Sequence, residues 1–142
     1  MEVKHCMNYP VELVRSDSTI RDAAERMSKY NLGFLPVEEN DRLVGMITDR
    51  DIVIRCLASG YNPESTSVKE AMTKAVYYCF EDEELDEVAK SMSRQAVRRM
   101  PVLNRNKRLI GVVSLSDLAR AEYEATGKTL KKISDRAFGY AF

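Results

Sequence analysis

The chain contains one internal repeat, and this repeat constrains its fold more than any other feature of the sequence. Residues 3–7 (VKHCM) match residues 68–72 (VKEAM), and the Pro-Val pair at residues 36–37 returns at residues 101–102. The two copies, each of about 60 residues, together cover residues 3–123. Self-similarity of this kind indicates two copies of one supersecondary unit, each too small to bury its apolar surface alone. We therefore expect the two copies to pack against each other.

Each copy presents the same order of predicted elements: strand, helix, strand, strand, helix. Residues 20–31 of the first copy place apolar side chains at helical spacing, and Ser18 or Thr19 ahead of them is a suitable N-cap. Apolar and β-branched runs predict the strands, and the polar insertions at residues 38–42 and 104–108 predict hairpin turns. The predicted fold class is α+β, with two β-α-β-β-α repeats packed sheet to sheet as one pseudo-two-fold module.

The repeat also predicts the organisation of the chain. The first repeat takes residues 1–61, a linker takes residues 62–66, the second repeat takes residues 67–123, and a C-terminal tail takes residues 124–142. The linker lies in a stretch rich in glycine, proline and serine. The tail is interpreted either as a helix docked on its own domain or as an interaction surface. Its apolar residues at helical spacing and at the end of the chain are Leu130, Ile133, Ala137, Phe138, Tyr140 and Phe142.

Composition excludes several classes of function. The chain carries 22 Lys plus Arg and 22 Asp plus Glu residues, so no overall charge would draw it onto nucleic acid or an anionic membrane. No apolar run approaches the roughly 18 residues of a membrane span, and the start lacks the apolar stretch of a signal peptide, which predicts a cytoplasmic protein. Cys6, Cys56 and Cys79 form no C-x-x-C motif and His5 is the only histidine, so neither a disulfide framework nor a metal site is expected.

The sequences GMITDRD and GVVSLSD share a glycine, two apolar residues, a hydroxyl residue and, three positions later, an aspartate. A strand that ends in Thr48 or Ser114 and turns into a helix exposes the first backbone N–H groups of that helix to an anion or polar ligand. Asp51 and Asp117 lie one helical turn further on, and a carboxylate can accept hydrogen bonds from the vicinal hydroxyls of ribose. The same spacing is that of a capping box, which needs no ligand. Both interpretations stay open at this point.

These motifs resemble the paired cystathionine β-synthase (CBS) domains. The resemblance rests on the V-K-x-x-M openings, the apolar-Pro-Val stretches and the sequences RLVGMITDRDI and RLIGVVSLSDL, and it covers about 120 of the 142 residues. It implies two β-α-β-β-α units side by side, often dimerised into a flat disc, with clefts that bind AMP, ADP, ATP or S-adenosylmethionine. It also implies a regulatory module and not an enzyme, with no required cofactor, that acts on an attached or separate effector.

The resemblance also assigns site residues by position. It makes Asp51 and Asp117 the ribose ligands, and it places the chain that enters each copy's first strand beside them, residues 73–76 at the Asp51 site and residues 8–11 at the Asp117 site. Backbone groups there would read adenine, although strand or loop packing explains the same residues without a ligand. The expected ligand-binding residues are Thr48, Asp51, Thr73, Val76, Asn8, Val11, Arg98, Arg99, Ser114 and Asp117.

The two copies differ where a ligand phosphate is expected. Residues 98–99 are two arginines where the first copy has Gly-Phe, and Asn8 takes the place of Thr73. Guanidinium groups bind phosphate through two aligned donors. We therefore expect the Asp117 site to bind nucleotides more tightly, and the Asp51 site to be weaker or to favour a less charged ligand.

Three classes of function remain open. The first is a regulatory module that binds an adenosine-containing ligand, forms a homodimer and signals to a separate partner. The second is a ligand-free dimeric scaffold. The third, a metal-dependent hydrolase using Asp49, Asp51 and Asp82, lacks a histidine base, a nucleophile motif and a metal spacing.

Overall fold

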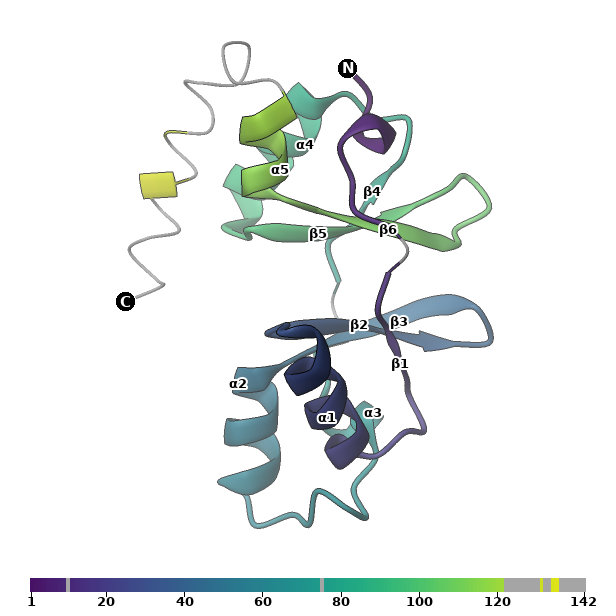
Figure 1. Cartoon of the computed structure of the whole chain (residues 1–142), viewed down its shortest axis with the longest axis vertical. Helices are drawn as coiled ribbons and strands as arrows, with labels where there is room; N and C mark the ends of the chain where they lie inside the picture. Colours follow the sequence, from purple (N-terminus) through teal and green to yellow (C-terminus); the bar gives the residue numbers. More distant parts are fainter. Residues whose placement is uncertain (10, 75, 122–130, 132–133, 136–142) are drawn as a thin grey trace. The chain divides into compact units, whose positions relative to one another are not determined.

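The computed structural model describes residues 1–9, 11–74, 76–121, 131 and 134–135. The chain forms two compact units (Figure 1). One, which we call the Asp51 unit, is Glu12–Val76, and the other, the Asp117 unit, contains Met1–Val11 and Tyr77–Phe142. The compact units therefore differ from the sequence repeats, because the opening segment of each copy folds with the sheet of the other copy. The predicted tail helix and the aromatic end of the chain lie outside the described residues.

The Asp51 unit is built on a three-stranded sheet whose helices lie on one face (Figure 1). Its elements are β1 (Val14–Arg15), α1 (Ile20–Tyr30), β2 (Phe34–Glu39), β3 (Arg42–Thr48), α2 (Asp49–Asp51), η2 (Ile52–Leu57) and α3 (Val68–Ala71). The strand order is β1-β2-β3, with β1 parallel and β3 antiparallel to the central β2. η2 continues the path of α2 as a π-helix, which accounts for the second predicted helix of this copy.

The sequence of α1 explains why the helix starts and ends where it does. Thr19 Oγ1 accepts a hydrogen bond from Asp22 N at 3.1 Å, and Thr19 N donates to Asp22 Oδ2 at 3.2 Å, which closes a capping box. Asn31 ends the helix in the left-handed conformation. Ile20 and Met27 are buried in the core, as the helical spacing predicted. Of the two suitable residues, Ser18 and Thr19, the N-cap of α1 is therefore Thr19.

The Asp117 unit repeats this architecture on a second three-stranded sheet (Figure 1). Its elements are η1 (Val3–His5), β4 (Cys79–Phe80), α4 (Leu85–Gln95), β5 (Arg99–Leu103), β6 (Leu109–Ser114) and α5 (Leu115–Ala121). The strand order is β4-β5-β6, again with one parallel and one antiparallel pair. The predicted α+β fold with two copies of one unit is thus confirmed.

Two short helical turns were not predicted. η1 is a three-residue 3₁₀ turn and α3 has four residues, so neither is long enough to show helical periodicity. Their first residues, Val3 and Val68, are fully buried, each in the core of the unit with which it folds. The repeated V-K-x-x-M opening is therefore an anchor that fixes the segment following it.

Candidate functional site

The Asp51 site lies where β3 turns into α2. Thr48 Oγ1 accepts a hydrogen bond from Asp51 N at 3.0 Å, and Thr48 N donates to Asp51 Oδ2, also at 3.0 Å. This is a capping box with aspartate at its third helical position. Asp51 is buried, so the cap holds an ionisable carboxyl group in one orientation below the surface.

The Asp117 site has the same construction between β6 and α5. Ser114 N donates to Asp117 Oδ2 at 2.8 Å, and Ser114 Oγ accepts from Asp117 N at 3.2 Å. Asp117 is also buried. The capping interpretation of the repeated motif is therefore confirmed in both copies. The cap occupies one carboxylate oxygen in each copy and leaves the role of the other oxygen open.

An arginine from the same helix stands beside each aspartate, and sequence reasoning missed both. Arg55 Nε lies 3.7 Å from Asp51 Oδ1, and Arg55 Nη1 also donates to the Met72 carbonyl oxygen at 3.1 Å. Arg120 Nη2 donates to Asp117 Oδ1. The acid–arginine spacing on a helix was an available signal. It was hidden because the arginine is four residues after the aspartate in one copy and three residues after it in the other.

The segments predicted to border each site do so through backbone pairing. Met46 N donates to the Thr73 carbonyl oxygen at 2.9 Å, and Thr73 N donates back at 2.8 Å, two residues before Thr48 on β3. Asn8 and Val112 pair in the same way at 2.9 and 3.1 Å, two residues before the end of β6. The structure thus brings the expected opening segment beside the motif in each unit.

The glycine of each motif permits this pairing. A Cβ atom on Gly45 would lie 2.8 Å from the Thr73 carbonyl oxygen and 2.6 Å from Met72 Sδ. A Cβ atom on Gly111 would lie 3.1 Å from the Asn8 carbonyl oxygen and 2.6 Å from a methionine sulfur. Both distances to sulfur are shorter than real Cβ contacts. The glycine therefore serves the close approach of a neighbouring segment.

Asn8, which belongs to the first copy but folds with the Asp117 unit, makes a side-chain contact that the resemblance did not imply. Asn8 Nδ2 donates to Asp117 Oδ2 at 2.7 Å. Asp117 Oδ2 consequently accepts two hydrogen bonds, from this amide and from Ser114 N. The residue at the matching position, Thr73, pairs with β3 through its backbone.

The remaining predicted residues lie around the sites without touching the aspartates in any contact that the structure gives. Arg99 is the first residue of β5 and lies opposite Ser114 in the β5–β6 ladder. The Arg98 carbonyl oxygen accepts from Leu115 N at 2.9 Å, and both arginine side chains are exposed. The two predicted apolar wall residues are half-buried; these are Val11 and Val76.

A hollow of about 940 Å³ opens on the Asp51 unit. Its lining residues are Glu39, Arg55, Tyr61, Lys69, Glu70, Met72, Thr73 and Lys74. Arg55 and Thr73 connect it to the surroundings of Asp51, and two lysines add positive charge. Three cationic side chains against two glutamates leave the lining with one excess positive charge, which favours an anionic group of a ligand held at Asp51.

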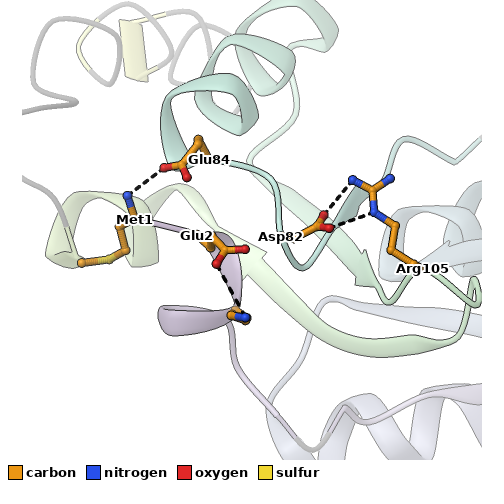
Figure 2. A network of polar contacts seen from close by, with 6 residues as sticks. Met1, Glu2, Asp82, Glu84 and Arg105 are labelled. Carbon is orange, nitrogen blue, oxygen red and sulfur yellow. Dashed lines mark hydrogen bonds and ion pairs between the residues drawn. The ribbon is translucent and has the colours of Figure 1, made fainter.

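The residues weighed for a hydrolase are held in separate interactions. Asp82 accepts hydrogen bonds from Arg105 Nε at 3.0 Å and Nη2 at 2.8 Å, beside the contact of the Met1 amino group with Glu84 (Figure 2). The hydrogen bond from Arg105 lowers the pKa of the Asp82 carboxyl below its ordinary value.

Within the part of the chain that the structure describes, no three His, Cys, Asp or Glu side chains are grouped to hold a metal ion. None of the described helices has the length and apolar character needed to cross a membrane.

Comparison with known proteins places these features in a family. A family model described as CBS domain matches residues 3–57 and 68–124. The chain is 38% identical over 115 residues to hypoxic response protein 1 of Mycobacterium tuberculosis, covering 80% of each chain. A crystal structure of Hypoxic Response Protein I with two coordinated zinc ions superposes with a TM-score of 0.77 at 36% identity, over 85% of this chain and 98% of that one. The CBS domain pair of protein MJ0100, in complex with 5′-methylthioadenosine and S-adenosyl-L-methionine, superposes with a TM-score of 0.73 at 32% identity, over 90% and 98% of the two chains.

Proposed function

Because this chain belongs to the CBS domain family, we propose that it is a regulatory module that binds adenosine-containing ligands at Asp51 and Asp117 and signals their occupancy to a separate protein. The observation that carries the proposal is a buried carboxylate, fixed by a capping box, at the same strand-to-helix turn of each unit. A carboxylate held in this way is preorganised to accept hydrogen bonds from the vicinal hydroxyls of ribose. The complex of MJ0100 with two adenosine-containing molecules supports this class of ligand.

At the Asp51 site, the two carboxylate oxygens have different tasks in this proposal. Oδ2 stays with the cap, while Oδ1, which faces Arg55 across 3.7 Å, accepts from the ribose. Backbone groups around Thr73 read the adenine edge, and Val76 covers one face of the ring. The positive charges of Arg55 and Lys74 favour phosphate-bearing ligands of the AMP, ADP and ATP type. The alternative is S-adenosylmethionine, which has no phosphate and carries a sulfonium and a zwitterionic amino-acid group.

At the Asp117 site, the exposed pair Arg98 and Arg99 supplies the phosphate contacts, and Val11 takes the place of Val76. Arg99 is the better placed of the two arginines because it lies opposite Ser114 in the ladder. The ligand is bound and released unchanged, and no residue is assigned a catalytic task.

We further propose that the protein works as a homodimer in the cytoplasm. The exposed apolar face of η2 supports the dimer. Cys56 and Cys79, which are buried thiols outside any disulfide, support a reducing compartment. A ligand-free scaffold of the same fold is the second candidate, since the capping box alone explains the aspartates structurally.

The test is calorimetric titration of AMP, ATP and S-adenosylmethionine into the wild type and into Asp51→Asn. The amide keeps one oxygen for the Thr48 cap but loses the charge and the second acceptor. A hydrogen bond to a charged group contributes about 1.5–3 kcal/mol, so the affinity of the Asp51 site should fall about tenfold to a hundredfold.

The matched control is Asp22→Asn, which makes the same change in the Thr19 capping box on α1, away from the proposed site. Its binding should equal that of the wild type. Equal losses in both variants would show that the cap and not the ligand contact is being measured. Absence of saturable binding to the wild type would favour the scaffold.

A further inference from the structure

The two aspartates occupy matching positions in the repeat, but their hydrogen bonding differs. Both oxygens of Asp117 are engaged by the chain: Oδ2 accepts from Ser114 N at 2.8 Å and from Asn8 Nδ2 at 2.7 Å, and Oδ1 accepts from Arg120. The Asp117 side chain is 3% exposed. A ligand hydroxyl that reaches this carboxylate must therefore replace a donor that is already present.

Asp51 is more accessible. Its Oδ2 accepts from Thr48 N, while the contact that the structure gives its Oδ1 is the ion pair with Arg55 at 3.7 Å, which exceeds hydrogen-bond length. The guanidinium of Arg55 donates to the Met72 carbonyl oxygen, and the Asp51 side chain is 12% exposed. A ligand hydroxyl can reach Oδ1 without displacing a hydrogen bond that the described residues make.

The position of Asn8 is set by the fold. Its backbone pairs with Val112 on β6, and the preceding turn η1 is anchored by the buried Val3, whose N–H donates to the Glu83 carbonyl oxygen at 2.9 Å. Asn8 itself is exposed, so its side chain can leave Asp117 for water. An amide N–H₂ group also matches a pair of hydroxyls in presenting two donors on one small group.

We propose that Asn8 is an internal competitor for ribose at Asp117, so that the Asp51 site fills first and the Asp117 site fills only at higher ligand concentration. This inference rests on the proposed function. It reverses the order of affinity expected from the arginine pair, because exposed arginines add a screened contact whereas Asn8 occupies Asp117 Oδ2, the oxygen that Arg120 leaves to a ligand. A hydrogen bond from a ligand hydroxyl to an unoccupied carboxylate would raise the affinity about tenfold to a hundredfold. At Asp117 the ligand must first break the hydrogen bond from the Asn8 amide, so this gain in affinity is lost.

The consequence is a module with two response thresholds for one ligand. The threshold of the second site is set by a side chain from the segment at the other end of the sequence. Copying Thr73 into position 8 should free Asp117 Oδ2 from the amide while Arg120 stays on Oδ1, and copying Asn8 into position 73 should weaken the first site.

The experiment is a calorimetric titration of AMP into the wild type, Asn8→Thr, Asn8→Ala and Thr73→Asn, with the side-chain amide signals of Asn8 followed by NMR. Wild type should bind in two phases, and the Asn8 amide signals should shift in the weaker phase. Asn8→Thr and Asn8→Ala should tighten the weaker phase about tenfold or more and leave the tighter one in place, while Thr73→Asn should weaken the tighter phase.

The outcomes separate the inference from the function beneath it. No binding in the wild type and in all variants would overturn the proposed function. Binding in two phases, with the weaker phase unchanged or weakened further by both Asn8 substitutions, would overturn the role of Asn8 alone. Asn8→Ala guards against a new contact made by threonine, since alanine can only remove the amide.

Discussion

Gly45 and Gly111 have no side chain because another segment of backbone passes directly over them. The conformations of these residues do not require glycine, since neither has a positive φ. What excludes a Cβ atom is the closeness of Met72 and Thr73 to Gly45, and of Met7 with Asn8 to Gly111. At the scale of single residues, the first residue of the motif places the neighbouring segment and the last residue supplies the carboxylate.

Gly45→Ala should destabilise the protein by about 1–3 kcal/mol, because the added Cβ must push the Thr73 backbone away from β3. Urea denaturation measures the loss. Gly33→Ala is the matched control, since the atoms nearest to its Cβ would be those of the carboxylate of the exposed Asp49, at 3.3 Å. Equal stability of the two variants would contradict the close approach at Gly45.

Cys79 makes the free energy of unfolding depend on pH in the alkaline range. Burial raises the pKa of its thiol to about 12 from 9.0, with further contributions from Glu83 and Cys6. The unfolded thiol therefore loses its proton near pH 9 while the folded thiol keeps it, so the folded state loses about 1.4 kcal/mol per pH unit above pH 9. Compared with Cys79→Val, the wild type should become less stable as pH rises from 9 to 10.5. A constant difference over this range would contradict the burial effect.

The helices that follow the two motifs each place an arginine beside the aspartate, but they do so with different helix geometry. Arg55 is four residues after Asp51 in a π-helix, whose wider turn is marked by the hydrogen bond from Ala58 N to the Val53 carbonyl oxygen at 2.8 Å. Arg120 is three residues after Asp117 in an α-helix. At the scale of elements, the change of helix type accompanies a one-residue shift of the arginine and still leaves a guanidinium at each aspartate.

Arg55→Met should lower the free energy of unfolding by about 1 kcal/mol, because the hydrogen bond to the Met72 carbonyl is lost and the half-exposed ion pair adds little. Chemical denaturation of Arg50→Met, an exposed arginine on the same helical path, provides the comparison. If both substitutions cost the same, Arg55 does not tie η2 to the end of α3.

The elements that the sequence predicted are those long enough for a periodic pattern of apolar residues to be detected. The strands β2, β3, β5 and β6 and the helices α1 and α4 follow from apolar spacing, whereas β1 and β4 are only two residues long, shorter than the apolar runs that predicted them. The Thr-x-x-Asp and Ser-x-x-Asp pairs correctly indicated caps. The turns η1 and α3 are too short for such a signal. The arginine partners were missed because they do not align in the repeat. The contact of Asn8 with Asp117 depends on where one amide points, which no spacing encodes.

At the scale of the whole molecule, the exposed apolar face of η2 indicates an interface with another protein chain. Val53, Ile54 and Leu57 are 52%, 49% and 53% exposed, and three neighbouring apolar side chains on one short helix are suited to an interface. A two-fold dimer would cover the face with its own copy and double its buried area.

Sedimentation at tens of micromolar should therefore give twice the 16.2 kDa of the chain. Ile54→Lys with Leu57→Lys should shift the protein to the monomer, because two charges would be buried at the interface. Tyr30→Lys, at an exposed apolar residue of α1, should leave the dimer intact. A monomer in the wild type would contradict this assembly.

Ligand binding without turnover is the central claim, and equilibrium dialysis with chromatographic recovery of the ligand tests it most directly. The wild type is dialysed against AMP, ADP, ATP and S-adenosylmethionine in turn, and the bound and free molecules are identified afterwards. We predict saturable binding of at least one of them, up to two per chain, with every molecule recovered unchanged. Recovery of hydrolysed ligand in proportion to protein, or no retention of any of the four, would contradict the account.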